Sequence, residues 1–229
     1  MAVNVAVTSD VICPWCYIGK RRLEKAIAAC QGQHDVRVRW HPFQLNPHMP
    51  KEGMNRKEYR TAKFGSWERS LALDAQVAEA GQAEGIPFDY AKVMRTPNTF
   101  DAHRLIWLAH RDGVQDAVVE AVFRAYFTEG RDISRSAVLL DVVAEGGLDR
   151  KRAETFLNGD EGLAAIRAAE EQARRGGVQG VPYFLINGTM ALSGAREPSA
   201  FLDAFEQAAV TSEDEGSVCK IGPGGEPSC

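Results

Sequence analysis

The chain lacks the features that mark membrane proteins and nucleic-acid-binding proteins. No run in its 229 residues approaches the roughly 20 consecutive apolar residues that a membrane-spanning helix needs. Its 27 basic residues are balanced by 31 acidic ones, which gives a formal net charge of -4 and no polybasic segment. Because anionic membranes and nucleic acids are bound by clustered Lys and Arg, we expect neither as a partner. The first residues also lack the basic and apolar regions of a secretory signal, so we expect a cytoplasmic protein.

Cysteine is scarce, at five residues, but two of these, Cys13 and Cys16, have the C-x-x-C spacing. A structural zinc site needs a second pair of Cys or His ligands at short spacing, and none follows, so we expect no metal. A static disulfide between the two cysteines is harder to exclude. In a cytoplasmic protein, however, thiols are mostly reduced, which favours a catalytic or sensing role over a structural bridge.

The C-x-x-C pair lies where a strand pattern changes to a helix pattern. Residues 3–8 alternate with the period of a strand. Downstream, Cys16, Leu23 and Cys30 recur every seven residues on one apolar stripe. Cys13 would then lie at the helix N-terminus, where free backbone N–H groups and the helix dipole favour a thiolate, and thiols so placed have pKa values of roughly 3.5 to 7.5. We therefore predict Cys13 as the exposed nucleophile and Cys16 as the half-buried resolving thiol.

Four segments carry motifs that are more specific together than singly. They are Cys13-Pro14-Trp15-Cys16-Tyr17-Ile18-Gly19, Trp40-His41-Pro42-Phe43-Gln44-Leu45-Asn46-Pro47, Asn98-Thr99-Phe100-Asp101-Ala102-His103-Arg104 and Gly177-Val178-Gln179-Gly180-Val181-Pro182-Tyr183-Phe184. Together they resemble the DsbA-like thioredoxin-fold oxidoreductases, in particular the FrnE-like branch. The resemblance covers most of the chain. It implies that the Val181-Pro182 bond is cis, lies against the C-x-x-C pair and offers backbone hydrogen bonds to a bound polypeptide.

Five residues beside the two cysteines are candidates for substrate binding: Pro14, Trp15, His103, Val181 and Pro182. Pro14 suits a first helical turn, where its missing N–H costs nothing, and the Trp15 ring is expected to cover the site. His103 has two interpretations, because it could line the substrate groove or be an ordinary, partly buried histidine.

Asp10 also has two interpretations: it could relay a proton to Cys16 or cap the following helix, and the cap is favoured. Cys30 would lie about 21 Å from Cys16 along a helix, whereas a disulfide holds Cα atoms within about 7 Å. Cys30 is therefore predicted to be a buried small hydrophobe. Trp40 and His41 are predicted to finish a strand beneath the active-site loop, where they serve packing rather than chemistry.

The patterns predict an α/β protein: a thioredoxin fold interrupted by a large all-helical insertion, with a flexible C-terminal tail. The thioredoxin-like domain would comprise residues 1–46 and 161–210, the insertion 47–160 and the tail 211–229. Residues 3–8, 14–30 and 35–41 form a β-α-β unit with parallel strands. Asp160 is expected to cap a helix at 161–175. The other expected elements are helices at 55–64, 66–84, 98–112, 114–129, 135–145, 150–158 and from 198 to about 210, and a hairpin at 183–192 around Asn187-Gly188.

The polar segment after Val210 carries the remaining two cysteines, Cys219 and Cys229. Closing the loop between them would remove on the order of 3 kcal/mol of entropy from an unlinked chain, but this cancels if the tail is flexible in folded and unfolded protein alike. Three interpretations remain: an accessory dithiol that exchanges with Cys13 and Cys16, a bridge that restrains the tail, or unpaired thiols. The resemblance supports the first two, because FrnE-like proteins can carry extra C-terminal cysteines.

These observations favour a thiol-disulfide oxidoreductase that acts on protein or peptide disulfides and dithiols, or on small thiols such as glutathione, without a cofactor. A second hypothesis is a glutathione-dependent isomerase or transferase of the 2-hydroxychromene-2-carboxylate isomerase or kappa-class type. Those proteins usually have a lone Ser at the first active-site position, and the two cysteines here argue against them. A third hypothesis is a non-catalytic, chaperone-like binding module.

Overall fold

A parallel β-α-β unit begins the fold in residues 2–216, the part of the chain that the computed structural model describes, with side chains up to residue 209. β1 (Ala2–Ser9) and β2 (Asp35–Pro42) are parallel and aligned along their full length. α1 (Pro14–Ala29) connects them. The predicted unit is therefore confirmed, and it places the end of β1 beside the start of α1.

Two further strands complete a four-stranded sheet with the order β2-β1-β5-β6. β5 (Tyr183–Ile186) is antiparallel to both β1 and β6 (Met190–Ser193). The predicted hairpin is confirmed, and Asn187 and Gly188 have the positive φ angles, 47° and 75°, that tight hairpin turns require. The Asn187 side chain accepts a hydrogen bond from the Asn4 backbone N–H at 2.8 Å, which ties the turn to β1.

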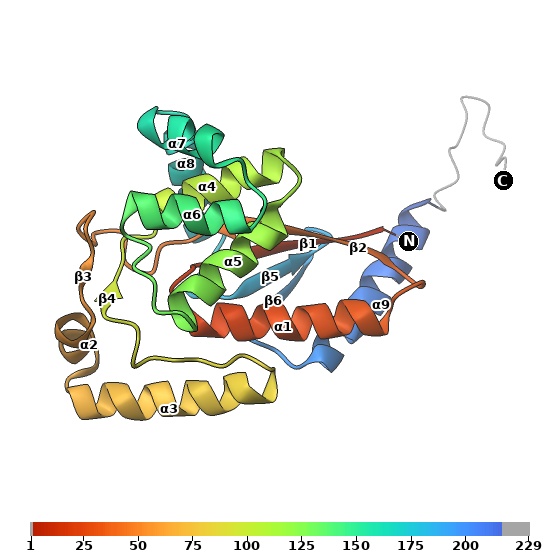
Figure 1. The fold of residues 1–229 in the computed structure, drawn as a ribbon. Coiled ribbons are helices and arrows are strands. Elements are labelled where there is room, and N and C mark those ends of the chain that lie inside the picture. The colour runs from red at the N-terminus through yellow and green to blue at the C-terminus, as the bar shows by residue number, and fades with distance from the viewer. Residues whose placement is uncertain (1, 217–229) are drawn as a thin grey trace, which may run out of the picture.

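The last helix, α9 (Pro198–Gly216), packs against α1, β1 and β5 (Figure 1). It ends six residues later than the position near Val210 that the sequence patterns predict. The reason is that no Gly or Pro interrupts the chain between Pro198 and Gly216, and acidic residues alone do not end a helix. The helix thus takes in residues 211–216, which the sequence patterns assign to the tail. Cys219 and Cys229 lie outside the described residues.

The segment between β2 and β5 is helical, as predicted, and α4, α5 and α8 pack against β2. In Figure 1 the helices α4 to α8 gather on one side of the sheet, while α1 lies on the other side, with α3 alongside α1 and α2 beside α3. The helices of this segment are α2 (Arg56–Phe64), α3 (Trp67–Ala83), α4 (Phe100–Arg111), α5 (Gln115–Phe127), α6 (Ser136–Glu145), α7 (Arg150–Asn158) and α8 (Leu163–Arg175).

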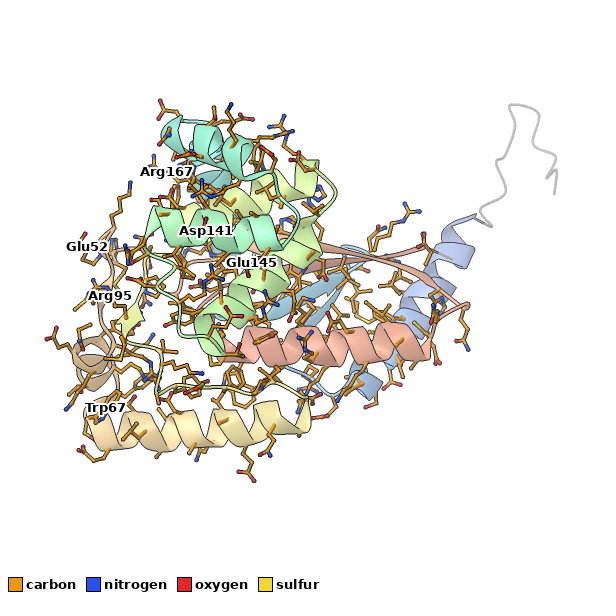
Figure 2. The ribbon with its side chains drawn as sticks, viewed as in Figure 1. Glu52, Trp67, Arg95, Asp141, Glu145 and Arg167 are labelled. Carbon is orange, nitrogen blue, oxygen red and sulfur yellow. The ribbon has the colours of Figure 1, made fainter. Side chains whose placement is uncertain are left out.

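A small second sheet within this segment was not predicted. β3 (Met54–Asn55) pairs antiparallel with β4 (Arg95–Thr96), and two residues per strand are too few to show an alternating pattern. The guanidinium of Arg95 donates to the backbone carbonyl of Glu52 at 2.7 Å; both residues are labelled in Figure 2. This pairing joins the start of α2 to the chain that leads into α4.

The predicted cap of α8 is wrong. The helix begins at Leu163, its N-cap is Gly162 with φ 82°, and no side chain caps it. Asp160 lies two residues too early, so only its backbone carbonyl accepts a hydrogen bond, from Leu163 N–H at 3.2 Å. A Cβ on residue 162 would lie 2.9 Å from the Phe156 ring, so glycine permits both the left-handed turn and the close approach.

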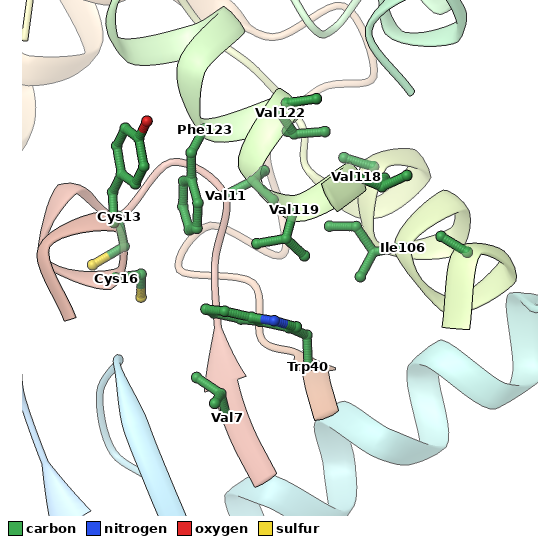
Figure 3. Packing of buried hydrophobic residues seen from close by; sticks show 14 of the residues in the cluster. Val7, Val11, Cys13, Cys16, Trp40, Ile106, Val118, Val119, Val122 and Phe123 are labelled. Atoms are coloured by element: carbon green, nitrogen blue, oxygen red, sulfur yellow. The ribbon is translucent and has the colours of Figure 1, made fainter. Parts of the chain in front are cut away.

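One cluster of buried hydrophobic side chains joins the sheet to the inserted helices. Val7 of β1 and Trp40 of β2 face Val119 and Phe123 of α5 across this core (Figure 3). Tyr17 of α1 stacks on Phe123 with ring centroids 5.0 Å apart, a contact of the kind that contributes about 0.5–1.5 kcal/mol beyond burial. The first turns of α1 are thus held by the sheet on one side and by α5 on the other.

Candidate functional site

Cys13 and Cys16 lie on the first turn of α1, and both are free thiols. Cys13 is the N-cap residue, and Pro14 occupies the first helical position, where no N–H is needed. The Cys13 N–H donates to the Asp10 carbonyl at 3.0 Å, and the Cys16 N–H donates to the Cys13 carbonyl at the same distance. These bonds close a tight turn that brings both sulfur atoms to the same end of the helix (Figure 3).

The exposure of both thiols is lower than the sequence predicts. Cys13 is 6% exposed rather than open, and Cys16 is fully buried rather than half-buried. The physical reason is that the inserted segment builds walls around the start of α1, and these walls come from residues far away in the sequence. The order of the two is nevertheless as predicted, because Cys13 is the more accessible thiol.

Burial dominates the chemistry of Cys16. It raises the pKa of the Cys16 thiol well above its usual range, and the hydrogen bond and charge of Cys13 raise it further. The Ser9 hydroxyl and the Asp10 backbone N–H lower this pKa without reversing the shift. At neutral pH Cys16 is therefore a protonated thiol, which must lose its proton before it can act as a nucleophile.

The Val181-Pro182 peptide bond is cis and lies beside the cysteines, as predicted. The Cys13 thiol donates to the Val181 carbonyl oxygen across 3.5 Å. Gly19 makes this close packing possible, because a Cβ there would lie 3.2 Å from the Pro182 ring and 3.1 Å from Phe184. A substrate contact with Val181 and Pro182 stays a prediction.

Cys13 opens into a cavity of about 300 Å³. Trp15, which is 42% exposed, stands at its rim together with Pro14. The remaining walls come from the loop after β2, from α2 and α3, from the loop after α3 and from the end of α5; their side chains include Leu45, Asn46, Tyr59, Phe64, Val77, Tyr90, Tyr126 and Phe127. The cavity is thus mainly apolar and aromatic, with Cys13 at one end.

Positive charge outweighs negative charge in this cavity. Arg56, Arg60 and Lys63 of α2 line it, whereas Asp74 of α3 is the single carboxylate among the lining residues. Asp74 is bound by Arg56 at 2.6 Å and by Arg60 at 2.7 Å. Lys63 donates instead to the Tyr59 hydroxyl at 2.8 Å. The arrangement can therefore attract a negatively charged group close to Cys13.

The sequence patterns did not single out these cations. Arg56, Arg60 and Lys63 follow one another at i, i+4 and i+7, the spacing of one helix face, which usually marks a face open to solvent. The spacing was therefore a usable signal, but only the fold turns this face toward Cys13.

The structure corrects the interpretation of Asp10 and places His103. The N-cap of α1 forms no side-chain hydrogen bond, and the Asp10 carboxylate instead accepts from the Leu45 N–H at 2.7 Å. The predicted helix cap is therefore wrong, because the turn from Asp10 to Cys13 directs the carboxylate toward the loop after β2. His103 of α4 is buried behind this loop, with Nε2 3.4 Å from Asp10 Oδ1, and it lines a different cavity from that of Cys13.

The structure also places the three residues that were predicted to serve packing. Cys30 is buried and donates to the Ile27 carbonyl, as expected of a small hydrophobe. Trp40 is buried, and its indole N–H donates to Asp116 at 2.9 Å. Burial lowers the pKa of His41 to about 4, with the charges of Arg39 and His110 adding to the shift, so His41 is neutral at pH 7.

Neither a metal centre nor a membrane span is present in the described part of the chain. Among residues 2–216, no group of three or more His, Cys, Asp or Glu side chains is arranged to hold a metal ion. No helix within the same residues is both long enough and apolar enough to cross a bilayer.

Comparison with known proteins agrees with this geometry. A crystal structure of a probable DsbA oxidoreductase from Streptomyces coelicolor is 30% identical, has a TM-score of 0.82 and is matched over 99% of both chains. The uncharacterized protein YwbO from Bacillus subtilis is 28% identical over 212 residues, which are 91% of this chain and 96% of YwbO. The cytosolic disulfide reductase DsbM from Pseudomonas aeruginosa, in a structure with GSH, is 23% identical, with a TM-score of 0.58 and coverage of 93% and 98%, and this likeness concerns the fold alone.

The family model described as the DSBA-like thioredoxin domain matches residues 4–206, nearly the whole of the described chain. The matched region contains the C-x-x-C turn, the cis-proline loop and all of the helical insertion. With its thioredoxin-like sheet, its helical insertion and the cysteine pair on α1, this chain belongs to the DsbA-like thioredoxin-domain family.

Proposed function

We propose that this protein catalyses thiol-disulfide exchange, with Cys13 as the attacking thiol and Cys16 as the resolving thiol. One observation carries the proposal: Cys13 opens into the cavity, whereas Cys16 is fully buried behind it on the same helical turn. Because a substrate disulfide can approach Cys13 alone, the two cysteines have different roles.

The reaction has two steps. The Cys13 thiolate, at the positive end of α1, attacks one sulfur of a substrate disulfide, and the other substrate sulfur leaves as a thiolate. Cys16 then loses its proton and attacks the Cys13 sulfur, which breaks the mixed disulfide and releases the second substrate thiolate. The substrate gains two electrons, and the protein is left with a Cys13–Cys16 disulfide. The reverse sequence oxidises a dithiol.

The Val181 backbone is suited to hold an extended substrate. Its carbonyl oxygen lies 3.5 Å from the Cys13 sulfur, so a peptide paired with this segment would present its cysteine to Cys13. Pro14 and Trp15 form the other side of the opening. We assign these residues and Pro182 to substrate binding. His103 is left out of this set, because it lies behind the loop that follows β2.

The cavity favours small disulfides that carry carboxylates, and we propose glutathione disulfide as one substrate class beside protein disulfides. A cavity of about 300 Å³ admits part of a small peptide. The excess of cations from α2 complements carboxylates. The reductive direction, a cytoplasmic location and membership of the FrnE-like branch belong to the same proposal.

The proposal is tested with Cys13→Ser and Cys16→Ser variants in reduction of insulin and of glutathione disulfide. Both variants should lose turnover, and only Cys16→Ser should accumulate a mixed disulfide, detected by mass spectrometry. Trapping by Cys13→Ser alone would reverse the assignment. Turnover of 2-hydroxychromene-2-carboxylate, or suppression of citrate synthase aggregation without any reductase activity, would favour one of the two alternative functions.

A further inference from the structure

A second cavity adjoins the loop after β2, and the two-step scheme does not use it. Its volume is about 510 Å³, and it shares no lining residue with the cavity of Cys13. Gln44 lines this second cavity, whereas the next two residues of the loop, Leu45 and Asn46, line the first. We call it the α8 cavity, after the helix that contributes Leu163, Arg167 and Glu170 to its walls.

Positive charge in the α8 cavity is only partly neutralised. Lys51 and Arg167 line it with exposed side chains, and neither takes part in a salt bridge within the described part of the chain; Arg167 is labelled in Figure 2. Asp101 pairs with Arg104 at 3.2 Å, so these two charges offset each other. The remaining carboxyl group is that of Glu170, and burial raises its pKa, which lessens its negative charge. The cavity is therefore suited to an anion.

The start of α8 adds to this positive potential. Its first residue, Leu163, lines the cavity, its N-cap is a glycine without a capping side chain, and its first turn holds no acidic residue. An uncapped helix N-terminus carries a partial positive charge that favours anions. The start of α4 also borders the cavity, but there Asn98 accepts the Phe100 N–H at 2.9 Å and Asp101 occupies the first turn. The helix contribution thus comes from α8.

Hydrogen bonds to the first residues of α4 hold two walls of the cavity in place. Arg104 of α4 donates to the backbone carbonyl of Glu161 at 2.9 Å, just before α8 begins. On another wall, Asn98 donates to the Met49 carbonyl at 2.6 Å, close to the turn that carries Lys51. The cavity is therefore formed in the absence of a ligand, as small-molecule sites usually are.

The inner wall of the α8 cavity is polar and incompletely hydrogen-bonded. Gln44 is 4% exposed and Glu170 is 9% exposed. An unsatisfied buried polar group is costly, so native proteins keep few of them. Gln44 and Glu170 belong to a group of five buried residues, the cluster behind Cys16, in which each has one polar side-chain atom without a hydrogen-bond partner among the described residues: Ser9 Oγ, Asp10 Oδ1, Gln44 Nε2, His103 Nε2 and Glu170 Oε1.

We propose that the α8 cavity binds a phosphate group, held by Arg167 and Lys51 at the N-terminal end of α8. A tetrahedral dianion presents oxygens in several directions, which suits two cations from separate elements and a helix N-terminus, whereas one guanidinium satisfies a planar carboxylate. Gln44 Nε2 donates to a further phosphate oxygen, and a hydroxyl of the ligand donates to Glu170 Oε1. The ligand is therefore inorganic phosphate or the phosphate monoester of a small hydroxylated metabolite. The inference does not rest on the proposed thiol-disulfide exchange.

The test is titration calorimetry of the full chain with inorganic phosphate and, separately, with glycerol 3-phosphate, at constant ionic strength in chloride buffer. Arg167→Gln should weaken the binding of both about tenfold, and Lys51→Gln about fivefold, because each variant removes a charge-assisted hydrogen bond. Binding of both probes assigns the site to a phosphate monoester, and binding of inorganic phosphate alone assigns it to the free ion. Succinate, the carboxylate probe, should bind at least about tenfold more weakly than phosphate. Equal binding of succinate would overturn the assignment to phosphate.

Arg175→Gln is the matched control, because it removes the same charge from the last turn of the same helix. Arg175 binds Glu171 and does not line the cavity. This variant should bind phosphate within about twofold of wild type, since a distant exposed charge is screened by salt. An equal loss in the Arg167 and Arg175 variants would mean that overall charge attracts the anion, and the site would be wrong.

Gln44→Met tests the inner wall of the cavity. It should weaken phosphate binding about threefold, because one donor to the phosphate is lost. If this buried variant does not fold, Arg167→Gln decides, since Arg167 is exposed. Absence of phosphate binding by the wild-type protein would overturn the inference, while the reactions of Cys13 and Cys16 would remain open to their own test.

Discussion

Two clusters of buried charged and polar side chains border α1, and they differ in how completely their atoms are hydrogen-bonded. Lys20, with a side chain 2% exposed, contacts Asp116 at 3.0 Å and Glu120 at 3.3 Å and also binds Glu24. The cluster behind Cys16 instead leaves five buried polar atoms without hydrogen-bond partners among the described residues. In the Lys20 cluster one atom, Glu120 Oε2, lacks such a partner among the described residues, although it lies 3.3 Å from Lys20 Nζ. The Lys20 cluster is thus the more completely paired of the two.

The Lys20 cluster connects several elements of the fold. Asp116 also accepts the Trp40 indole N–H at 2.9 Å, and Glu120 accepts the Tyr17 hydroxyl at 2.8 Å. Burial lowers the pKa of Lys20, but the nearby carboxylates outweigh burial and raise it overall, so the ammonium stays charged. This cluster therefore joins α1, α5 and β2 through a lysine that stays charged.

The largest expected effect tests whether the Lys20 cluster is structural. Lys20→Met should lower the free energy of unfolding by about 2–3 kcal/mol, below the usual range for a broken buried pair because Glu24 and Asp116 are partly exposed. In the folded variant, the attack of Cys13 on a disulfide and the resolution by Cys16 should both keep their wild-type rates. Urea unfolding and rapid mixing measure the two properties.

The control for that variant is Lys25→Met on the same helix. Lys25 is half exposed and contacts Glu84, so its loss should cost at most about 1 kcal/mol. A Lys20 variant that is as stable as this control would contradict the structural role of the Lys20 cluster. A variant in which only resolution by Cys16 is slower would contradict it as well.

A second prediction concerns acid stability at His41. Burial first, and then the charges of Arg39 and His110, lower the pKa of His41 to about 4, below the unfolded value of 6.5. The unfolded chain therefore binds more protons between these two values, and stability should fall as the pH drops from 6.5 towards 4. The loss attributable to His41 should reach about 2 kcal/mol. Urea unfolding of wild type and His41→Gln at pH 7 and pH 4.5 measures it, and an identical loss in both proteins would contradict the assignment.

A third prediction tests whether the cations of the cavity beside Cys13 bind the substrate, in contrast to the buried charges on the other side of Cys16. Lys63→Met should raise the KM for glutathione disulfide about fivefold, equivalent to about 1 kcal/mol, and leave kcat unchanged, because Lys63 lines the cavity and does not touch the thiols. Steady-state kinetics provide the measurement. Lys57→Met, on another face of α2, should have no effect. Equal changes in the two variants would mean that overall charge, rather than the cavity, attracts the substrate.

The smallest expected effect on stability concerns Cys219 and Cys229. Deletion of residues 217–229 should leave the thermal midpoint nearly unchanged while slowing turnover or changing the preferred reductant, if the pair exchanges with Cys13 and Cys16. A Cys219→Ser, Cys229→Ser variant of the full chain is the matched control for the length of the deletion. A lowered thermal midpoint would favour a structural bridge, and unchanged kinetics would leave these thiols without a role in exchange.

The sequence by itself determined the elements and the position of the reactive pair. Strand alternation over residues 3–8 and helical spacing after Cys13 are local patterns, and Pro14 and the Asn187-Gly188 turn are local signals as well. Such signals predicted the β-α-β unit, the helical segment and the hairpin, because secondary structure follows mainly from neighbouring residues. The cis Val181-Pro182 bond was predicted only from the resemblance to a family.

Tertiary structure decided the exposure of the thiols and the partners of the polar residues. Cys13 is buried because α2, α3 and the loop after α3 meet above it, and no local pattern reports such distant walls. Asp10 follows β1 and His103 lies on α4, so the 3.4 Å approach of their side chains arises only when α4 packs against β2. Burial and charge act through space rather than along the chain, and for this reason the sequence located the nucleophile while the fold determined its surroundings.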